Sequence, residues 1–311
     1  MTEEEVMIDG RFPIGATIAY NDTDRKSPAI VIIMGTGKTD RDGNIKNYRM
    51  NIYKDMSDLF SECGYVTARY DKRGTHRSEG DMGSAGLNDL VDDAISVIQY
   101  VKSLPYVDEN RVFVCGHSEG AIIATILSGK EDVAGLMLLG GAAMSLKDAL
   151  RYQNREVAEE ASSKKGIMGL LMKGASSEEK NCAKVDAMFR KCSETDRDTV
   201  WFGGAKIAAK WIREHDSYTS DVLIGMLRSY GGPVLAITGK ADLSADWRWL
   251  DNISDRPDTE CYAPDNVNHI LREIDDDNSI MHVKKQYLRL SKNPMHEGTR
   301  EVIRRWLESR L

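Results

Sequence analysis

Short runs rich in β-branched residues alternate with longer stretches whose apolar residues repeat at helical spacing, and this alternation constrains the fold of the 311-residue chain most strongly. It is typical of a mostly parallel sheet with helices on both faces, so we expect an α/β fold. The predicted strands cover residues 29–34, 65–70, 111–115, 134–139, 233–238 and 259–263.

Two helices and a hairpin are also predicted. The clearest helix covers residues 87–101, where apolar residues form one stripe that would lie on the sheet. A helix over residues 299–311 closes the chain with a similar apolar face. Residues 6–8 and 14–20 flank a turn and predict an antiparallel hairpin that leads into the sheet.

The strand-helix rhythm stops over residues 141–230, which are helical in period and rich in Lys, Glu and Met. We predict a helical cap at 141–230, inserted into a core formed by 1–140 and 231–311. Apolar residues of this cap would either form a flexible lining of a binding pocket or pack inside the cap itself. These residues are Met168, Met172, Met188, Trp201 and Trp211.

Residues 116–120 read Gly-His-Ser-Glu-Gly and lie directly between a predicted strand and an apolar, helix-like run. A serine at a sharp strand-to-helix turn has a strained backbone, and the two glycines let neighbouring backbone pass close by. We therefore predict Ser118 as a nucleophile. The backbone N–H of Glu119, at the start of the helix, would donate to an oxyanion.

A serine nucleophile needs a histidine base that a carboxylate holds in place. Of six histidines, His269 follows the last predicted strand, where the carboxyl end of the sheet would present it above Ser118. Asp242 follows the preceding strand, which gives the chain order serine, acid, histidine. Asp246 is the reserve candidate for the acid, although we interpret it as a helix N-cap ahead of Trp247.

The turn after the first parallel strand, residues 35–43, should supply a second oxyanion donor, which we place at the backbone N–H of Thr36. Two nucleotide-binding patterns overlap this turn. The phosphate-loop pattern requires glycine where Ile32 stands, and the dinucleotide pattern requires glycine or alanine where Asp40 stands. Both patterns fail, so we expect no cofactor.

Composition narrows the classes of partner. The formal net charge is −7 and the basic residues are scattered, which argues against nucleic acid. The N-terminus is acidic and no run approaches the roughly 20 apolar residues of a membrane span, so we expect a soluble cytoplasmic protein without a membrane partner. Five cysteines without a C-x-x-C pair predict neither disulfides nor a metal site. Oligomeric state is not set by the sequence, and a homodimer stays open.

Together these stretches resemble the α/β-hydrolase superfamily. Within it, the chain is similar to bacterial carboxylesterases related to dienelactone hydrolases and to the serine aminopeptidase-like group, in which G-x-G-x-x-D-R-D-G often follows the oxyanion strand. Met34 departs from the histidine that many relatives carry there, which leaves the N–H donor intact. The resemblance rests on residues 35–43, 69–74, 116–120, 239–242 and 268–269.

The resemblance implies an α/β-hydrolase fold and a cofactor-free Ser-His-Asp mechanism that cleaves small acyl esters through an acyl-serine. It supports the same roles for the five predicted site residues, Ser118, Asp242, His269, Thr36 and Glu119.

Two other functions stay open at this point. An aminopeptidase or amidase would need a cap carboxylate to bind the substrate ammonium group, although a solvated helix face explains the acidic residues of the cap equally well. A catalytically silent protein would use the cleft only to bind a ligand. The candidate cap carboxylates are Glu156, Glu159, Glu160 and Asp216.

Overall fold

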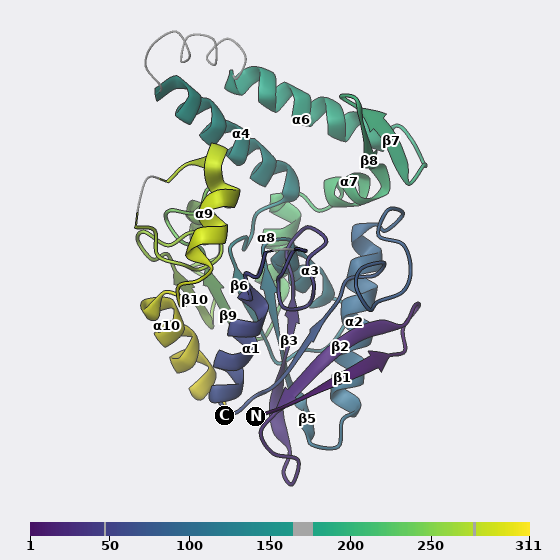
Figure 1. The fold of residues 1–311 in the computed structure, drawn as a ribbon, viewed down its shortest axis with the longest axis vertical. Coiled ribbons are helices and arrows are strands. Elements are labelled where there is room, and N and C mark those ends of the chain that lie inside the picture. Colours follow the sequence, from purple (N-terminus) through teal and green to yellow (C-terminus); the bar gives the residue numbers. More distant parts are fainter. Residues whose placement is uncertain (47, 164–176, 276–277) are drawn as a thin grey trace.

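The computed structural model describes residues 1–311 except 47, 164–176 and 276–277. One central sheet contains, in spatial order, β1 (Thr2–Ile8), β2 (Ile14–Tyr20), β4 (Val66–Tyr70), β3 (Ser27–Ile33), β5 (Val107–His117), β6 (Gly135–Leu139), β9 (Val234–Ile237) and β10 (Thr259–Tyr262) (Figure 1). Neighbouring strands from β4 to β10 are parallel, whereas β2 pairs antiparallel with both β1 and β4.

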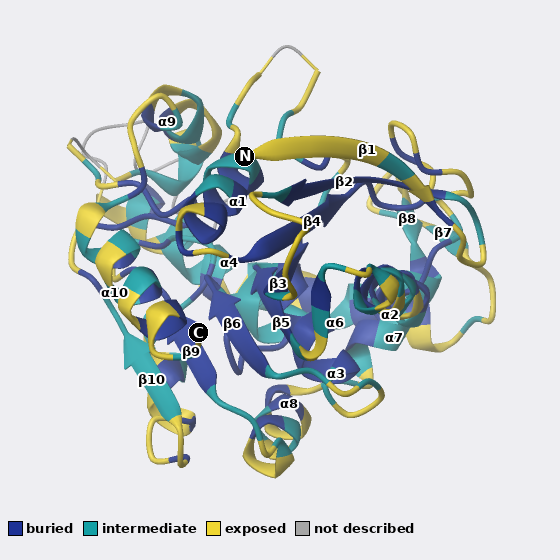
Figure 2. Cartoon of the chain, turned by 90° about the horizontal axis from the view of Figure 1, so that it is seen from below, coloured by how far each residue is buried: buried dark blue, intermediate teal, exposed yellow. Residues whose placement is uncertain are grey.

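Helices cover both faces of the sheet, because successive side chains of a strand point to opposite faces. Ile30 and Ile32 of β3 pack toward α1 (Ile52–Glu62) and α10 (Glu297–Glu308). Val31 and Ile33 pack on the other face, toward α2 (Leu87–Ser103), α3 (Glu119–Leu127) and α8 (Ser220–Ser229). Figure 2 shows the buried strands between these two layers.

The expected mostly parallel sheet, the lead-in hairpin and the two strongest helix predictions are confirmed. The first strand starts earlier than predicted, at Thr2, since it is an edge strand whose exposed Glu3, Glu4 and Glu5 hide the alternation that marks a half-buried strand. Charged side chains on an edge strand disfavour pairing with other chains.

The segment between β6 and β9 holds α4 (Leu146–Ser163), α6 (Glu178–Ser193), β7 (Thr199–Phe202), β8 (Ala205–Ala208), α7 (Ala209–Asp216) and α8. We call residues 146–216 the inserted segment; in Figure 1 it lies beyond the carboxyl ends of the parallel strands. Most of this region is helical, as predicted, but β7 and β8 form an antiparallel hairpin that the sequence analysis did not predict. Gly203 and Gly204 at its turn both have positive φ, which suits a tight hairpin.

Shorter elements follow β9 and carry the chain to its last helix. They are η1 (Trp247–Asn252), η2 (Ile280–His282) and α9 (Val283–Leu290).

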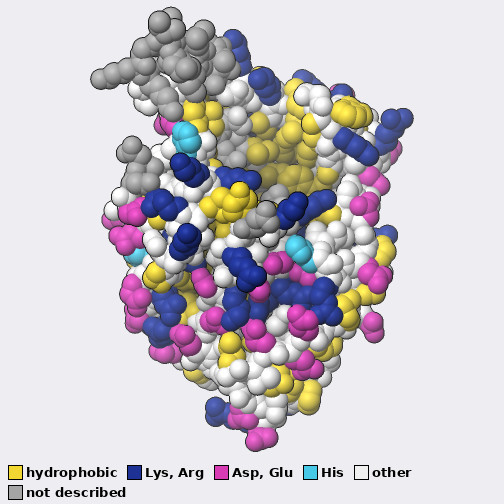
Figure 3. Space-filling model, viewed as in Figure 1, with side chains coloured by type: hydrophobic (Ala, Val, Ile, Leu, Met, Phe, Trp, Pro, Cys, Tyr) yellow, Lys and Arg dark blue, Asp and Glu magenta, His cyan; other side chains and the backbone are white. Residues whose placement is uncertain are grey.

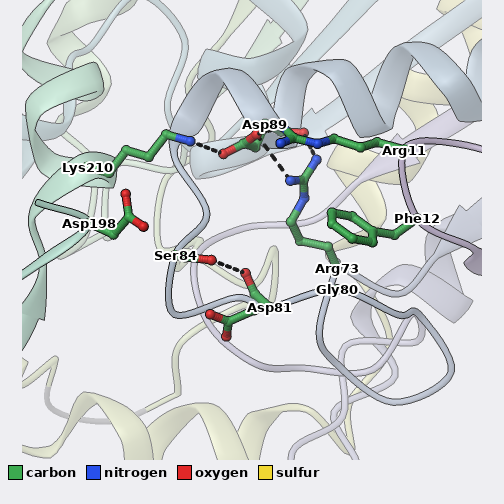
Figure 4. Close-up of a pocket in the computed structure, with 9 residues that line it drawn as sticks. All are labelled: Arg11, Phe12, Arg73, Gly80, Asp81, Ser84, Asp89, Asp198 and Lys210. Atoms are coloured by element: carbon green, nitrogen blue, oxygen red, sulfur yellow. Dashed lines mark hydrogen bonds and ion pairs between the residues drawn. The ribbon is translucent and has the colours of Figure 1, made fainter.

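Asp89 of α2 ties the inserted segment to the core (Figure 4). Its carboxylate accepts from Lys210 Nζ of α7 at 2.6 Å and from Arg11 Nη1 at 2.9 Å, and it lies 3.2 Å from Arg73 Nη1. These residues line a pocket of about 290 Å³. One carboxylate therefore joins three cations from three separate parts of the chain.

None of the described helices has the length and apolar character needed to cross a membrane.

Candidate active site

Ser118 sits at the turn between β5 and α3 with φ 57° and ψ −121°, a backbone conformation that costs a non-glycine residue about 1–3 kcal/mol. A Cβ on Gly116 would lie 2.1 Å from the Gly120 carbonyl oxygen, and a Cβ on Gly120 would lie 2.1 Å from the Ile33 carbonyl oxygen. Both glycines are therefore required by close backbone packing, as the sequence pattern predicts. The turn holds the serine at the carboxyl end of the sheet.

Asp242 and His269 follow β9 and β10 and meet through a 2.7 Å contact between Asp242 Oδ2 and His269 Nδ1. Asp242 is only 1% exposed, and its other oxygen accepts the backbone N–H groups of Ser244 at 2.7 Å and Ala245 at 3.0 Å. This arrangement fixes the carboxylate and leaves Nε2 of the imidazole available to accept a proton.

Ser118 and His269 line the same cavity of about 620 Å³. Gly140 and Gly141, after β6, lie against both: a Cβ on Gly140 would be 3.1 Å from His269 Nδ1, and one on Gly141 would be 3.0 Å from the Ser118 carbonyl oxygen. No hydrogen bond joins the Ser118 hydroxyl to the imidazole in the described part of the chain. The two side chains nevertheless face one space into which a substrate carbonyl would enter.

The cavity lies beneath the inserted segment and is mostly apolar. Figure 3 shows a hollow in the upper part of the molecule with hydrophobic side chains in its wall. Its apolar lining includes Ile52, Leu146, Leu150, Met188, Trp211 and Ile212.

The backbone N–H groups of Thr36 and Glu119 donate to no residue within the described ranges. Thr36 follows Gly35, whose N–H donates to Tyr53 Oη at 2.7 Å. A Cβ on Gly35 would lie 2.9 Å from Ser118 Cβ, so this turn packs directly against the serine. Two unused donors beside a serine can stabilise a negative oxygen that forms there.

A buried ion pair connects the two turns that carry these donors. Lys72 Nζ donates to Glu119 Oε2 at 2.6 Å and to the Gly35 carbonyl oxygen at 2.7 Å. Burial alone would raise the pKa of Glu119, but Lys72 and His215 hold that pKa below its ordinary value. The carboxylate is therefore charged although its side chain is only 2% exposed.

The same carboxylate contacts α7 of the inserted segment. Trp211 Nε1 donates to Glu119 Oε1 at 2.6 Å, and His215 Nε2 lies 3.4 Å from that oxygen. Sequence reasoning used only the backbone of Glu119. The available signal was its charged side chain at the start of an otherwise apolar helix.

His117 supports the loop that carries His269, a role that the sequence reasoning missed. Its Nε2 lies 2.8 Å from the His269 carbonyl oxygen, and its Nδ1 lies 3.2 Å from Tyr53 Oη. Burial, followed by the nearby charge of His269, lowers the pKa of His117 to about 3. The ring is thus a neutral bridge near neutral pH.

The sequence profile of the family described as serine aminopeptidase, S33, matches residues 47–247, which is more than half of the chain. The chain belongs to this S33 family of α/β hydrolases. The match includes Ser118 and Asp242 and ends before His269.

A curated relative, esterase EstD of Thermotoga maritima, is 26% identical over 246 residues. The aligned region covers 78% of this chain but 54% of EstD, so the chain spans about half the length of that relative.

Solved structures show the same fold at low identity. Est1E of Butyrivibrio proteoclasticus, solved with ferulic acid bound, superposes with a TM-score of 0.58 at 16% identity over 93% of this chain and 98% of that one. GrgF of Penicillium sp. sh18 gives a TM-score of 0.58 at 15% identity over 95% and 99% of the two chains.

In this S33 family member, the apolar cap residues and the reserve acid named from the sequence lie in different places. Met188 and Trp211 line the cavity, whereas Trp201 is 67% exposed and does not. Met168 and Met172 lie outside the described residues. Asp246 accepts from the backbone N–H of Arg248 at 3.1 Å, which confirms its interpretation as an N-cap.

The four acidic residues proposed to bind a substrate ammonium group do not line the described part of the cavity. Asp216 pairs with Lys147 at 3.3 Å, and Glu160 accepts from Ser279 Oγ at 2.7 Å. The other two are Glu156 and Glu159.

Proposed function

We propose that this S33 family member is a serine hydrolase that cleaves small carboxylic esters through an acyl-serine. Ser118 is the nucleophile, His269 the general base and Asp242 the acid that orients the imidazole. The observation that carries the proposal is the 2.7 Å contact between His269 Nδ1 and Asp242 Oδ2, with the imidazole in the cavity that Ser118 also lines.

In the first step His269 Nε2 accepts the Ser118 hydroxyl proton while the serine oxygen attacks the ester carbonyl. The N–H groups of Thr36 and Glu119 stabilise the oxyanion that forms. His269 then gives its proton to the departing alcohol, which leaves an acyl-serine. Water attacks this ester with the same imidazole as base, and the acid is released.

We also propose that residues 141–230 include a cap over a core formed by 1–140 and 231–311, in which α4, α6, the β7–β8 hairpin and α7 cover the site. Supporting this, Leu146, Met188 and Trp211 contribute to the cavity that contains Ser118. Helix α8 instead packs with α3 on the sheet, so the covering part ends before Ser220.

An ester substrate is favoured over a peptide by the lining of the cavity. A peptide N-terminus would need an unpaired carboxylate near Ser118, and the described lining contains none. EstD of Thermotoga maritima is named an esterase, which agrees with this choice. Because the family is described as serine aminopeptidase, cleavage of N-terminal amides is the alternative to be tested.

The test measures hydrolysis of p-nitrophenyl acetate and labelling by a fluorophosphonate probe. Ser118→Ala should lower kcat by about 10⁴-fold or more and abolish labelling. Ser128→Ala, at the other end of α3, is the matched control and should keep both. Full hydrolysis by Ser118→Ala would reject the assignment, and faster cleavage of aminoacyl-anilides than of esters would favour the peptidase.

A further inference from the structure

A second cavity of about 400 Å³ adjoins the one that contains Ser118. The two cavities share Thr36, Ile207, Ala208 and Trp211 in their walls. Glu119 also lines the second cavity, so both residues proposed to donate to the oxyanion border it. A substrate whose carbonyl lies at Ser118 could therefore extend one of its ends into this space.

Most of the second cavity is apolar and open. Met82, Ala85 and Ile207 form part of its wall, together with Gly37 and Gly83, which carry no side chain. At Gly37 an added Cβ would meet no atom within 4 Å. This space suits a flexible hydrocarbon portion of a ligand.

Its ionisable groups give it a positive character. Lys38 comes from the turn after β3 and Lys206 from β8, and neither ammonium has an ion-pair partner within the described ranges. The third ionisable group, Glu119, is already neutralised by Lys72 at 2.6 Å. Asp81 is close enough to feel the charge of Lys38, although the hydrogen bond from the backbone N–H of Gly83 is the main cause of its lowered pKa. Two cations therefore stand at a cavity in which Glu119, already paired, is the one carboxylate among the described lining residues.

We infer that the second cavity binds an anionic end of the ester substrate, a carboxylate carried on a short hydrocarbon chain, through Lys38 and Lys206. This inference rests on the proposed function. Under it, the enzyme prefers esters with a remote negative charge over neutral esters of the same length, because each ammonium attracts the carboxylate while the hydrocarbon fills the apolar space.

The test uses two pairs of substrates, so that the charge is placed in either the acyl or the alcohol part. The first pair is mono-p-nitrophenyl suberate, which carries a free carboxylate, and its neutral partner, the p-nitrophenyl ester of suberic acid monoamide. The second pair is ω-acetoxyoctanoate and ω-acetoxyoctanamide, whose hydrolysis is measured by the release of acetate. Each is assayed with the wild type, the Lys38→Met/Lys206→Met double variant and the control Lys130→Met, which removes one exposed lysine that lines neither cavity.

In at least one pair the double variant should raise KM for the anion by roughly 3–10-fold, which is the effect of two exposed charge pairs, while the neutral partner changes little. Added salt should weaken wild-type binding of the anion in the same pair. Equal changes for anion and neutral partner in both pairs, or the same change in Lys130→Met, would overturn the inference. If the wild type showed no Ser118-dependent hydrolysis of p-nitrophenyl acetate, the proposed function itself would be rejected.

Discussion

Glu119 and Lys72 form a buried ion pair with 2.6 Å between Oε2 and Nζ, and their side chains are 2% and 3% exposed. Lys72 also holds the Gly35 carbonyl oxygen, so one ammonium group joins the start of α3 to the turn before Thr36. Removing both charges from water is costly, and the hydrogen bonds from Lys72 and Trp211 offset that cost. The pair keeps the two proposed oxyanion donors in a fixed relationship.

Breaking this pair should destabilise the protein more than removing it. Glu119→Gln leaves the Lys72 charge buried without a counter-charge, and we expect a loss of about 3 kcal/mol in the free energy of unfolding by urea. Lys72→Met should cost a similar amount for the opposite reason. The Glu119→Gln/Lys72→Met double variant should recover most of the stability, because neither charge remains.

Activity measurements separate positioning of the two oxyanion donors from stabilisation of the fold. In the double variant the tie to the Gly35 carbonyl is absent, so kcat for p-nitrophenyl acetate should stay below that of the wild type at a temperature where both are folded. A double variant with wild-type kcat would show that the pair does not position the donors. Trp211→Phe keeps an aromatic ring and removes the Nε1 donor together with part of the indole, and therefore serves as the milder comparison.

Asp242 and Asp246 provide a direct comparison between the proposed catalytic acid and its reserve candidate. Asp242→Asn keeps the shape of the side chain but favours the wrong tautomer of His269, so kcat should fall by about 10⁴-fold. Asp246→Asn removes the ion pair with Arg248 but keeps a side-chain acceptor for the N-cap of η1, and neither residue lines the cavity, so kcat should stay within about twofold. Equal losses in both variants would contradict the assignment of Asp242.

Patterns in the chain were sufficient to predict the sheet and to place Ser118, Asp242 and His269 after its strands, because both depend on local rules. β-branched runs mark buried parallel strands, and residues that follow such strands gather at one edge of the sheet. Contacts between side chains distant in sequence left no such pattern. Glu119 and Lys72 are 47 residues apart, and His117 and the His269 carbonyl are 152 apart, so no spacing rule reveals them. The β7–β8 hairpin was missed because its strands are short and lie among helices.

His117 should make stability depend on pH. Its pKa falls from 6.5 to about 3 in the folded protein, chiefly through burial, so below pH 6.5 the unfolded chain binds a proton that the folded chain does not. Stability contributed by the neutral ring is therefore complete above pH 6.5 and decreases as the pH falls toward 3. Between pH 7.5 and pH 5 we expect a loss of about 2 kcal/mol from this group.

Urea unfolding at both pH values measures this loss, with His117→Gln as the control. Glutamine is neutral at every pH and can hydrogen-bond in the same place, so the variant should lose about 2 kcal/mol less than the wild type over this interval. If the two proteins lost equal stability, His117 would not be the buried neutral group that the structure indicates.

Asp89 should anchor the inserted segment to α2 through Lys210, Arg11 and Arg73 (Figure 4). Asp89→Asn removes the charge from a side chain that is 8% exposed, while Lys210 and Arg11 can regain water and Arg73 keeps Asp93 at 2.6 Å. We therefore expect a loss of about 2 kcal/mol in urea unfolding rather than the larger cost of isolating a fully buried cation. Asp92→Asn, an exposed change on the same helix, should stay within about 0.5 kcal/mol. Because α7 also carries Trp211 of the cavity wall, Asp89→Asn should raise KM for p-nitrophenyl esters as well, and an unchanged KM would show that this contact stabilises the fold without shaping the site.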